Sequence, residues 1–219
     1  MEELHCIRVT GKGQMKLRPD TTRIIMTLSG VYPDYSDALA HSAQDAEAIK
    51  DALVPLGFLR TEFKTQQFHV EPEYEGYDDH GVYKNRLIGY RCRHALKVEF
   101  PSDNERLGKV LSVLAHAAAE PELSIGYTVS DPEAAKAQLL ERAVEDAKNK
   151  AAVLAKAAGV TLLHIQTIDY AWQNTDLSVY PMQRNLLCKA EASADTFDLG
   201  IEPDDIEASD TVTVVFTIS

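Results

Sequence analysis

A row of residues in the first half of the chain has side chains that can bind metal ions: His69, Glu71, Glu73 and Glu75. Imidazole and carboxylate groups are common ligands of divalent metals. In an extended strand, residues two apart are separated by ~6.6 Å, so at most two neighbours would reach one ion. We therefore interpret this row as a solvated or cross-strand-paired face, and we expect no metal site.

A cysteine and a histidine in one predicted strand suggest thiol chemistry. Cys92 and His94 share a face of that strand, and an imidazole in contact with a thiol can produce a reactive thiolate. Their neighbours on this face are apolar, which favours burial and a packing role. We expect both to be core residues. If the chain acts in redox chemistry instead, Cys92 is the candidate thiol, although Cys6 and Cys188 are expected to be more exposed.

Gly11-Lys12-Gly13 follows a predicted strand, as phosphate-binding loops do. A dinucleotide fingerprint needs a third glycine and a helix directly after it, and a P-loop needs Gly-Lys-Ser or Gly-Lys-Thr. The chain has neither pattern here, so we interpret the segment as a structural turn. No nucleophile-elbow motif organises the serines, histidines and aspartates. The sequence therefore predicts no catalytic residue, no bound cofactor and no enzymatic activity.

The charge of the chain excludes two further classes of function. Its 219 residues include 22 Lys and Arg against 34 Asp and Glu, which gives a net charge of −12 at pH 7. Nucleic acids and anionic lipids are bound mainly through Lys and Arg, so we expect no nucleic acid and no membrane as a partner. The N-terminus has no leader pattern, and the three cysteines are scattered. We therefore expect a cytoplasmic protein.

Periodic apolar residues predict an alternation of strands and helices. The predicted strands span residues 4–10, 21–32, 61–75, 86–100, 122–130, 161–171 and 211–218. Two of them are expected to form a hairpin around residue 81, after a polar, glycine-containing turn from Gly76 to Gly81. This hairpin places Arg91 opposite Glu71 and Arg93 opposite His69. Helices are predicted after Pro33, after Pro101 and over 132–158.

The helix over 132–158 is expected to be the longest element. A capping residue, Asp131, precedes a proline at its first turn, and Gly159 ends it. Its expected inward face is rich in alanine: Leu140, Ala143, Val144, Ala147, Ala151, Leu154 and Ala158. The predicted fold class is α+β, a mixed, largely antiparallel sheet with about three helices packed on one face. We expect one domain over 1–219.

A long segment without regular pattern, 173–206, is expected to form a loop or arm. It carries apolar side chains within it or beside it: Trp172, Tyr180, Met182, Leu186 and Leu187. Such residues pack either on their own body or on another subunit. We treat them as the candidate self-association arm.

Several short motifs resemble one known family. Their order along the chain is Ile7-Arg8-Val9-Thr10-Gly11-Lys12-Gly13, Pro19-Asp20, Leu56-Gly57-Phe58, Pro72-Glu73-Tyr74, Gly89-Tyr90-Arg91 and Ile201-Glu202-Pro203. Ala143, Ala147, Lys150, Ala151 and Gly159 on the long helix add to the pattern. Together they resemble the SIMPL domain family, long described as a domain of unknown function.

The resemblance implies a modest set of expectations. The family includes bacterial envelope proteins, some linked to oxidative stress or known as antigens, and a cytosolic animal protein that associates with a Pelle-like kinase. Some bacterial members assemble into large rings, and no catalytic residue is assigned that could be carried over. We expect a non-enzymatic, self-associating interaction or scaffold protein, linked to stress response or signalling. The alternative is a small-molecule-binding or thiol-redox protein that uses the sheet face and a cysteine.

Overall fold

The computed structural model describes residues 5–171, 177–180 and 202–219. Its helices are α1 (Tyr35–Leu53), α2 (Asn104–Ala115) and α3 (Pro132–Ala158), with short 3-10 turns η1 (Val54–Leu56) and η2 (Arg60–Glu62). The strands are β1 (Cys6–Leu17), β2 (Thr21–Tyr32), β3 (Lys64–Asp79), β4 (Val82–Pro101), β5 (Glu122–Thr128), β6 (Leu162–Asp169), β7 (Ser178–Val179) and β8 (Ile206–Ile218). The predicted α+β class is confirmed.

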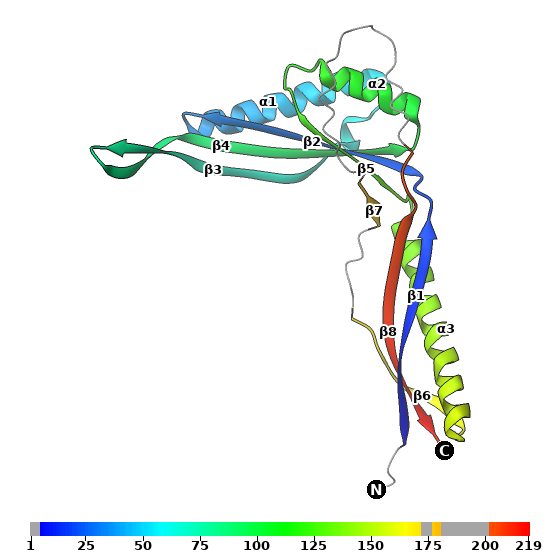
Figure 1. The fold of residues 1–219 in the computed structure, drawn as a ribbon. Helices are drawn as coiled ribbons and strands as arrows, with labels where there is room; N and C mark the ends of the chain where they lie inside the picture. The colour runs from blue at the N-terminus through cyan, green and yellow to red at the C-terminus, as the bar shows by residue number, and fades with distance from the viewer. Residues whose placement is uncertain (1–4, 172–176, 181–201) are drawn as a thin grey trace. The chain divides into compact units, whose positions relative to one another are not determined.

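The described strands belong to two sheets, and the chain divides into two compact units. The first unit contains the described parts of Met1–Asp20, Thr128–Val179 and Asp204–Ser219. The second contains Thr21–Tyr127 and the described parts of Tyr180–Pro203. Each unit is described below by itself (Figure 1). A single domain over 1–219 stays a prediction.

The first unit is an antiparallel sheet of order β1-β8-β6 with α3 along it. Asp131 caps the helix by accepting from the Ala134 N–H at 2.9 Å, and Gly159 ends it with a left-handed φ of 72°. The buried residues of α3 recur every four positions: Ala135, Leu139, Ala143, Ala147, Ala151 and Ala155. The row follows an i, i+4 ridge, which runs obliquely to the helix axis.

This oblique row corrects part of the predicted helix face. Ala143, Ala147 and Ala151 are buried as expected, whereas Leu154 is 48% exposed. Ala158 is also exposed. The predicted face keeps a constant angle along the helix, whereas the buried row rotates slowly around the axis. The prediction is therefore wrong at the C-terminal end of α3.

The expected turn at Gly11-Lys12-Gly13 is wrong, since β1 continues through it. A Cβ atom on Gly11 would lie 2.0 Å from the Ala143 carbonyl oxygen, and one on Gly13 would lie 2.0 Å from the Leu139 carbonyl oxygen. Glycine is needed here for close approach of the helix backbone.

Polar side chains of α3 bind the backbone of β1, which lies at the end of its sheet. Arg142 Nη1 donates to the Gln14 carbonyl oxygen at 2.9 Å, and Lys150 Nζ donates to that of Thr10 at 3.2 Å. The Lys12 N–H donates to Asp146 Oδ2 at 2.7 Å. These groups would otherwise be an open sheet edge, so α3 covers both a face and an edge of β1.

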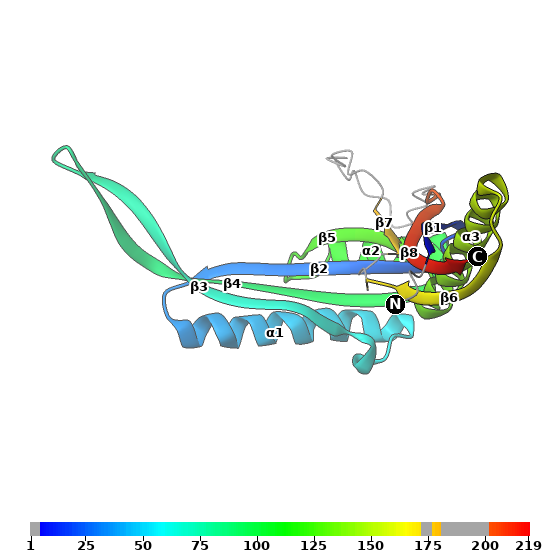
Figure 2. The same cartoon turned by 90° about the horizontal axis from the view of Figure 1, so that it is seen from below.

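The second unit is a sheet in the order β3-β4-β2-β5, with α1 and α2 on one face. Figure 2 shows α1 lying along the sheet. The core gathers apolar residues of both helices and of the strands beneath them: Ile24, Met26, Ile49, Leu53, Leu96, Val98, Leu107, Val110 and Leu114. Asp103 caps α2 by accepting from the N–H of Glu105 at 2.9 Å.

The predicted hairpin is confirmed with its register. Glu71 pairs with Arg91 and His69 with Arg93, and the strands run on to Asp79 and Val82. The two-residue turn has positive φ at His80 (56°) and Gly81 (85°). The polar turn expected over Gly76–Gly81 is therefore shorter, because β3 continues through Gly76.

Candidate functional site

In the row of potential metal ligands on β3, Glu73 and Glu75 make cross-strand ion pairs, one of the two predicted alternatives, whereas His69 Nε2 lies 3.4 Å from Glu71 Oε2 on the same strand. Arg91 donates to both carboxylate oxygens of Glu73, at 2.8 and 2.7 Å, and Arg86 Nη2 donates to Glu75 Oε2 at 2.6 Å. The hydrogen bond and charge of Arg91 lower the pKa of Glu73. Within the described ranges, no cluster of three or more His, Cys, Asp or Glu side chains is placed to hold a metal ion.

The candidate redox thiol lies in the core of the second unit. Cys92 is 2% exposed, so it is buried, as expected of a core residue. A buried sulfur has no path to an oxidant or a partner thiol, which weighs against the redox alternative. Cys6 is exposed, with Sγ donating to Gln166 Oε1 at 3.1 Å. Cys188 lies outside the described residues.

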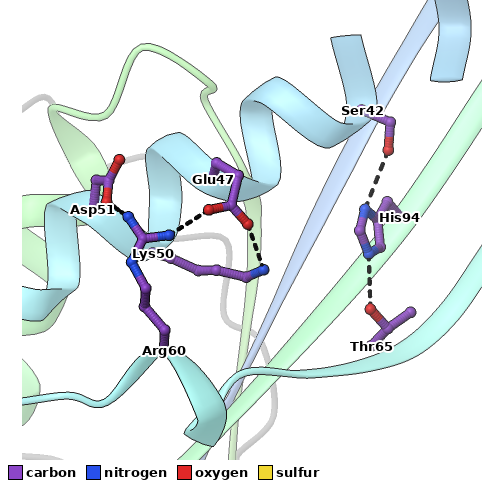
Figure 3. A network of polar contacts seen from close by, with 7 residues as sticks. All are labelled: Ser42, Glu47, Lys50, Asp51, Arg60, Thr65 and His94. Atoms are coloured by element: carbon purple, nitrogen blue, oxygen red, sulfur yellow. Dashed lines mark hydrogen bonds and ion pairs between the residues drawn. The ribbon is translucent and has the colours of Figure 1, made fainter. Parts of the chain in front are cut away.

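His94 joins three elements of the second unit, as Figure 3 shows. Its Nδ1 lies 3.1 Å from Ser42 Oγ of α1, and its Nε2 lies 3.0 Å from Thr65 Oγ1 of β3. The His94 ring lies nearly perpendicular to that of Phe68, with the centroids 5.1 Å apart. His94 is half-buried rather than fully in the core, which refines the prediction.

The Ser42–His94–Thr65 contacts fit a structural link better than a catalytic site. A hydroxyl bonded to an imidazole is the first pair of a nucleophile–base arrangement. The third member here is a hydroxyl instead of the carboxylate that orients a catalytic histidine. Ser42 is also only 5% exposed and lies within a helix. A neutral imidazole is satisfied by the two hydroxyls, each of which can donate or accept.

Sequence reasoning did not find Ser42 or Thr65 as partners of His94. A usable indication existed for Ser42, because it falls between Ala38 and Ala46 on the buried face of α1. A serine on an apolar face needs a hydrogen-bond partner. Which residue meets it depends on how α1 lies on the sheet.

Next to this link, Arg60 of η2 ties the segment after α1 back to the helix. It donates to the carboxylates of Glu47 and Asp51 (Figure 3), and Lys50 Nζ donates to Glu47 Oε1 at 2.8 Å. Arg60, Glu47 and Asp51 are each at least half exposed, so the cluster contributes little to stability. It fixes the path by which the chain enters β3.

The environment of His94 predicts a pH effect on stability. Burial, followed by the charge of Lys50, lowers its pKa below the ordinary value of about 6.5, against the opposing hydrogen bond to Ser42. The unfolded chain then binds the proton more tightly than the folded one, so stability declines as pH falls below about 6.5. We expect His94→Gln to flatten the dependence of the unfolding free energy on pH between about 5 and 6.5.

Urea unfolding of both proteins across this pH range measures the effect. Glutamine keeps a polar group at the site while removing the titration. The carboxylates that also titrate at low pH are common to both proteins, so they cancel in the comparison. Equal slopes in the variant and the wild type would contradict the prediction.

The predicted arm is described only in part. Trp172, Met182, Leu186 and Leu187 lie outside the described residues, and Tyr180 is 44% exposed. The Tyr180 ring covers Gly126, where an added Cβ would lie 2.6 Å from Tyr180 Cε1. Leu177 is buried in a cluster with Leu139 and Ile206. Where the structure describes this segment, its side chains contact the chain itself.

A surface that the sequence did not reveal lies on the hairpin. We call residues 73–89 the ribbon. It is the end of the β3–β4 hairpin that extends past Tyr90, where the pairing of β4 with β2 stops. Figures 1 and 2 show it extending past the end of α1. Six large side chains of the ribbon are exposed: Tyr74, Tyr77, Val82, Tyr83, Leu87 and Ile88. Their exposed fractions run from 39% at Tyr77 to 76% at Tyr83.

Both faces of the ribbon carry these apolar side chains. Tyr74 pairs with Leu87, and Tyr83 lies over Gly76 on the same face, where a Cβ would meet its hydroxyl at 1.9 Å. Tyr77 and Val82 lie on the other face, by the alternation of a strand. A two-stranded ribbon in water is only marginally stable. An exposed apolar ribbon is therefore a candidate contact surface.

Comparisons with known proteins place the chain. The family model of SIMPL, described as a protein of unknown function (DUF541), matches residues 7–216. The 26 kDa periplasmic immunogenic protein of Brucella melitensis biotype 1 is 26% identical over 157 residues. That alignment covers 71% of this chain and 62% of the relative, so the chain spans less than two thirds of the relative's length.

The solved structures that match include the regulatory subunit of aspartate kinase from Thermus flavus. It is 14% identical, with 96% of this chain and 89% of that chain covered, and its TM-score of 0.16 is too low to carry an argument. No helix among the described residues is long and apolar enough to cross a membrane. The family model covers almost the whole sequence, as the resemblance implied, and the chain therefore belongs to the SIMPL family.

Proposed function

We propose that this protein is a self-associating, non-enzymatic interaction protein, and that the ribbon makes the contacts between copies. The observation that carries the proposal is the exposure of six large apolar side chains on both faces of the ribbon. Burial of apolar surface contributes about 25 cal/mol per Å², so covering such a surface favours association. The 173–206 segment, the candidate from the sequence, stays a second contact to test.

A second copy of the chain fits the ribbon better than an unrelated acidic partner. Two molecules with a net charge of −12 repel each other over most of their surface. Two acidic residues of the ribbon are already paired with arginines of β4, Glu75 with Arg86 and Glu73 with Arg91. The ribbon is thus a place where two copies meet with little repulsion.

Light scattering on the purified chain tests the proposal. We expect a mass above the 24.2 kDa of one chain. The triple variant Val82→Ser, Leu87→Ser, Ile88→Ser removes apolar surface from the ribbon and leaves the core untouched. We expect it to return toward the mass of one chain and to keep its circular dichroism.

A matched control removes equally exposed apolar side chains elsewhere. Leu59, Val153 and Leu154 are 65%, 67% and 48% exposed, and their triple change to serine should keep the mass of the wild type. If the wild type is a monomer, the proposed function is wrong. If both triple variants associate like the wild type, the contacts lie elsewhere, and deletion of residues 181–200 tests the sequence-derived arm.

We also propose the cytoplasm as the location, because three scattered cysteines suit a reducing compartment better than a disulfide framework. The named relative is a periplasmic protein, so the two considerations differ. Fractionation of cells producing the native chain decides between them, with recovery in the periplasmic fraction contradicting the proposal.

A further inference from the structure

The ribbon has two sheet edges to which no strand is paired among the residues that the structure describes. β2 stops at Tyr32, opposite Tyr90, so β4 has an open edge from Val82 to Gly89. β3 is the first strand of its sheet and is open on its outer side. Open edges present backbone N–H and C=O groups that another strand can bind.

The turn of the hairpin determines which backbone groups face outward. In a two-residue hairpin with positive φ at both turn positions, the flanking residues form a hydrogen-bonded pair, here Asp79 and Val82. Hydrogen-bonded and non-hydrogen-bonded pairs then alternate. The N–H groups of Tyr83, Asn85 and Leu87 therefore face the open edge of β4. Those of Tyr74, Gly76 and Asp78 face the open edge of β3.

The two edges carry opposite charge. In the ribbon, β3 contributes Glu73, Glu75 and Asp78, whereas β4 contributes Lys84 and Arg86 and no acidic residue. Two β4 edges in antiparallel pairing about Asn85 would place Lys84 opposite Arg86 of the other copy. Like charges directly opposite destabilise a sheet, and opposite charges stabilise it.

We propose that the open edge of β4 in one copy pairs antiparallel with the open edge of β3 in the next copy. This inference rests on the proposed self-association and adds its partner surface and geometry. One register places Lys84 opposite Glu75 and Arg86 opposite Glu73 of the next copy. In this register, residues with outward N–H groups on β4 lie opposite residues with outward N–H groups on β3. The register that forms the ion pairs therefore also forms the backbone hydrogen bonds.

Pairing of two different edges has a consequence for assembly size. Each copy uses one edge to bind a neighbour and offers the other edge to a further copy. Such heterologous contacts do not close at two subunits. The mass of the wild type should therefore exceed twice the 24.2 kDa of one chain.

Proline substitutions test each edge separately in the full chain. Asn85→Pro removes an outward N–H from β4, and Tyr74→Pro removes one from β3, where Pro72 shows that the outer edge accepts proline. Each variant alone should be unable to form more than a small fraction of the wild-type assembly. Asn85→Ala and Tyr74→Phe keep the N–H groups, and the second also keeps the apolar ring, so both should assemble like the wild type.

The decisive measurement is light scattering on an equimolar mixture of the two proline variants. Asn85→Pro keeps an intact β3 edge and Tyr74→Pro an intact β4 edge, so the mixture should form a 1:1 complex with twice the mass of one chain. The formation of this complex also shows that both variants fold. A mixture that stays monomeric overturns the inference.

Other outcomes separate this inference from the proposed function. If Tyr74→Pro alone assembles fully, two β4 edges pair with each other and the inference is wrong. If both proline variants assemble fully, the ribbons pack face to face: self-association stands and edge pairing is overturned. A monomeric wild type overturns both.

Discussion

We expect Gly11→Ala to destabilise the protein by about 3 kcal/mol or more, at or above the upper end of ordinary overpacking costs. The added Cβ would lie 2.0 Å from the carbonyl oxygen of Ala143 and 2.6 Å from the backbone nitrogen of Ala147. These are backbone atoms of α3, so no side chain can rotate away. The helix must lift from β1, which also strains the bonds that Arg142 and Lys150 make to the strand.

The expected loss of stability in Gly11→Ala is opposite to the usual effect, because alanine in a strand is ordinarily favoured over glycine by roughly 0.5–1 kcal/mol. Gly11 does not have a positive φ, so alanine can adopt its backbone conformation. Gly57→Ala is the matched control: Gly57 has a φ of 85° and nothing within 4 Å of an added Cβ. There we expect a loss of about 1 kcal/mol from conformation alone. Urea unfolding compares the two, and a loss at Gly11 no greater than at Gly57 would refute close packing as the cause.

The second large effect is expected at Leu139→Ala, with a loss of about 3 kcal/mol in the free energy of unfolding. Leu139 is 0% exposed, whereas most other buried positions of α3 are alanines. Its side chain packs with Leu177, Ile206 and Ala208. The truncation leaves a cavity among these side chains, and the surrounding structure ordinarily relaxes only in part.

Leu154→Ala provides the control on the same helix. Leu154 was expected to face inward from the sequence, but it is 48% exposed. Its truncation should change stability by less than about 0.5 kcal/mol, as surface substitutions do. Thermal and urea unfolding of the two variants measure the difference. Equal losses at the two leucines would mean that the buried row of α3 does not follow the four-residue spacing.

The hairpin shows how much of the fold could be read from the sequence. Two alternating strands with a turn between them leave little freedom of register, because a slip of one residue turns every side chain to the other face. The pairs Glu71–Arg91 and His69–Arg93 followed from that rule and are present. The length of the ribbon did not follow, since Gly76 was read as part of the turn. The ring of Tyr83 covers this glycine and lets the strand continue.

The site residues show the opposite case. Cys92 and His94 were placed on one face correctly, but Ser42 and Thr65 come from α1 and β3. Their meeting depends on how the helix and the neighbouring strand lie over β4. A pattern within one segment holds no information about how far that segment lies from the others in the fold. The open edges of the ribbon were missed for the same reason, because they exist only where β2 ends beside β4.

The sequence by itself determined the elements, the α+β class, the family and the acidic character of this protein. Each depends on residues close together in the chain, where periodicity, caps and turn residues act directly on the backbone. Only the tertiary structure decided that Gly11 and Gly13 lie against a helix instead of in a turn, that the strands divide between two sheets, and that the ribbon has two open edges of opposite charge. These features depend on contacts between distant segments, whose geometry is set by the packing of the whole chain.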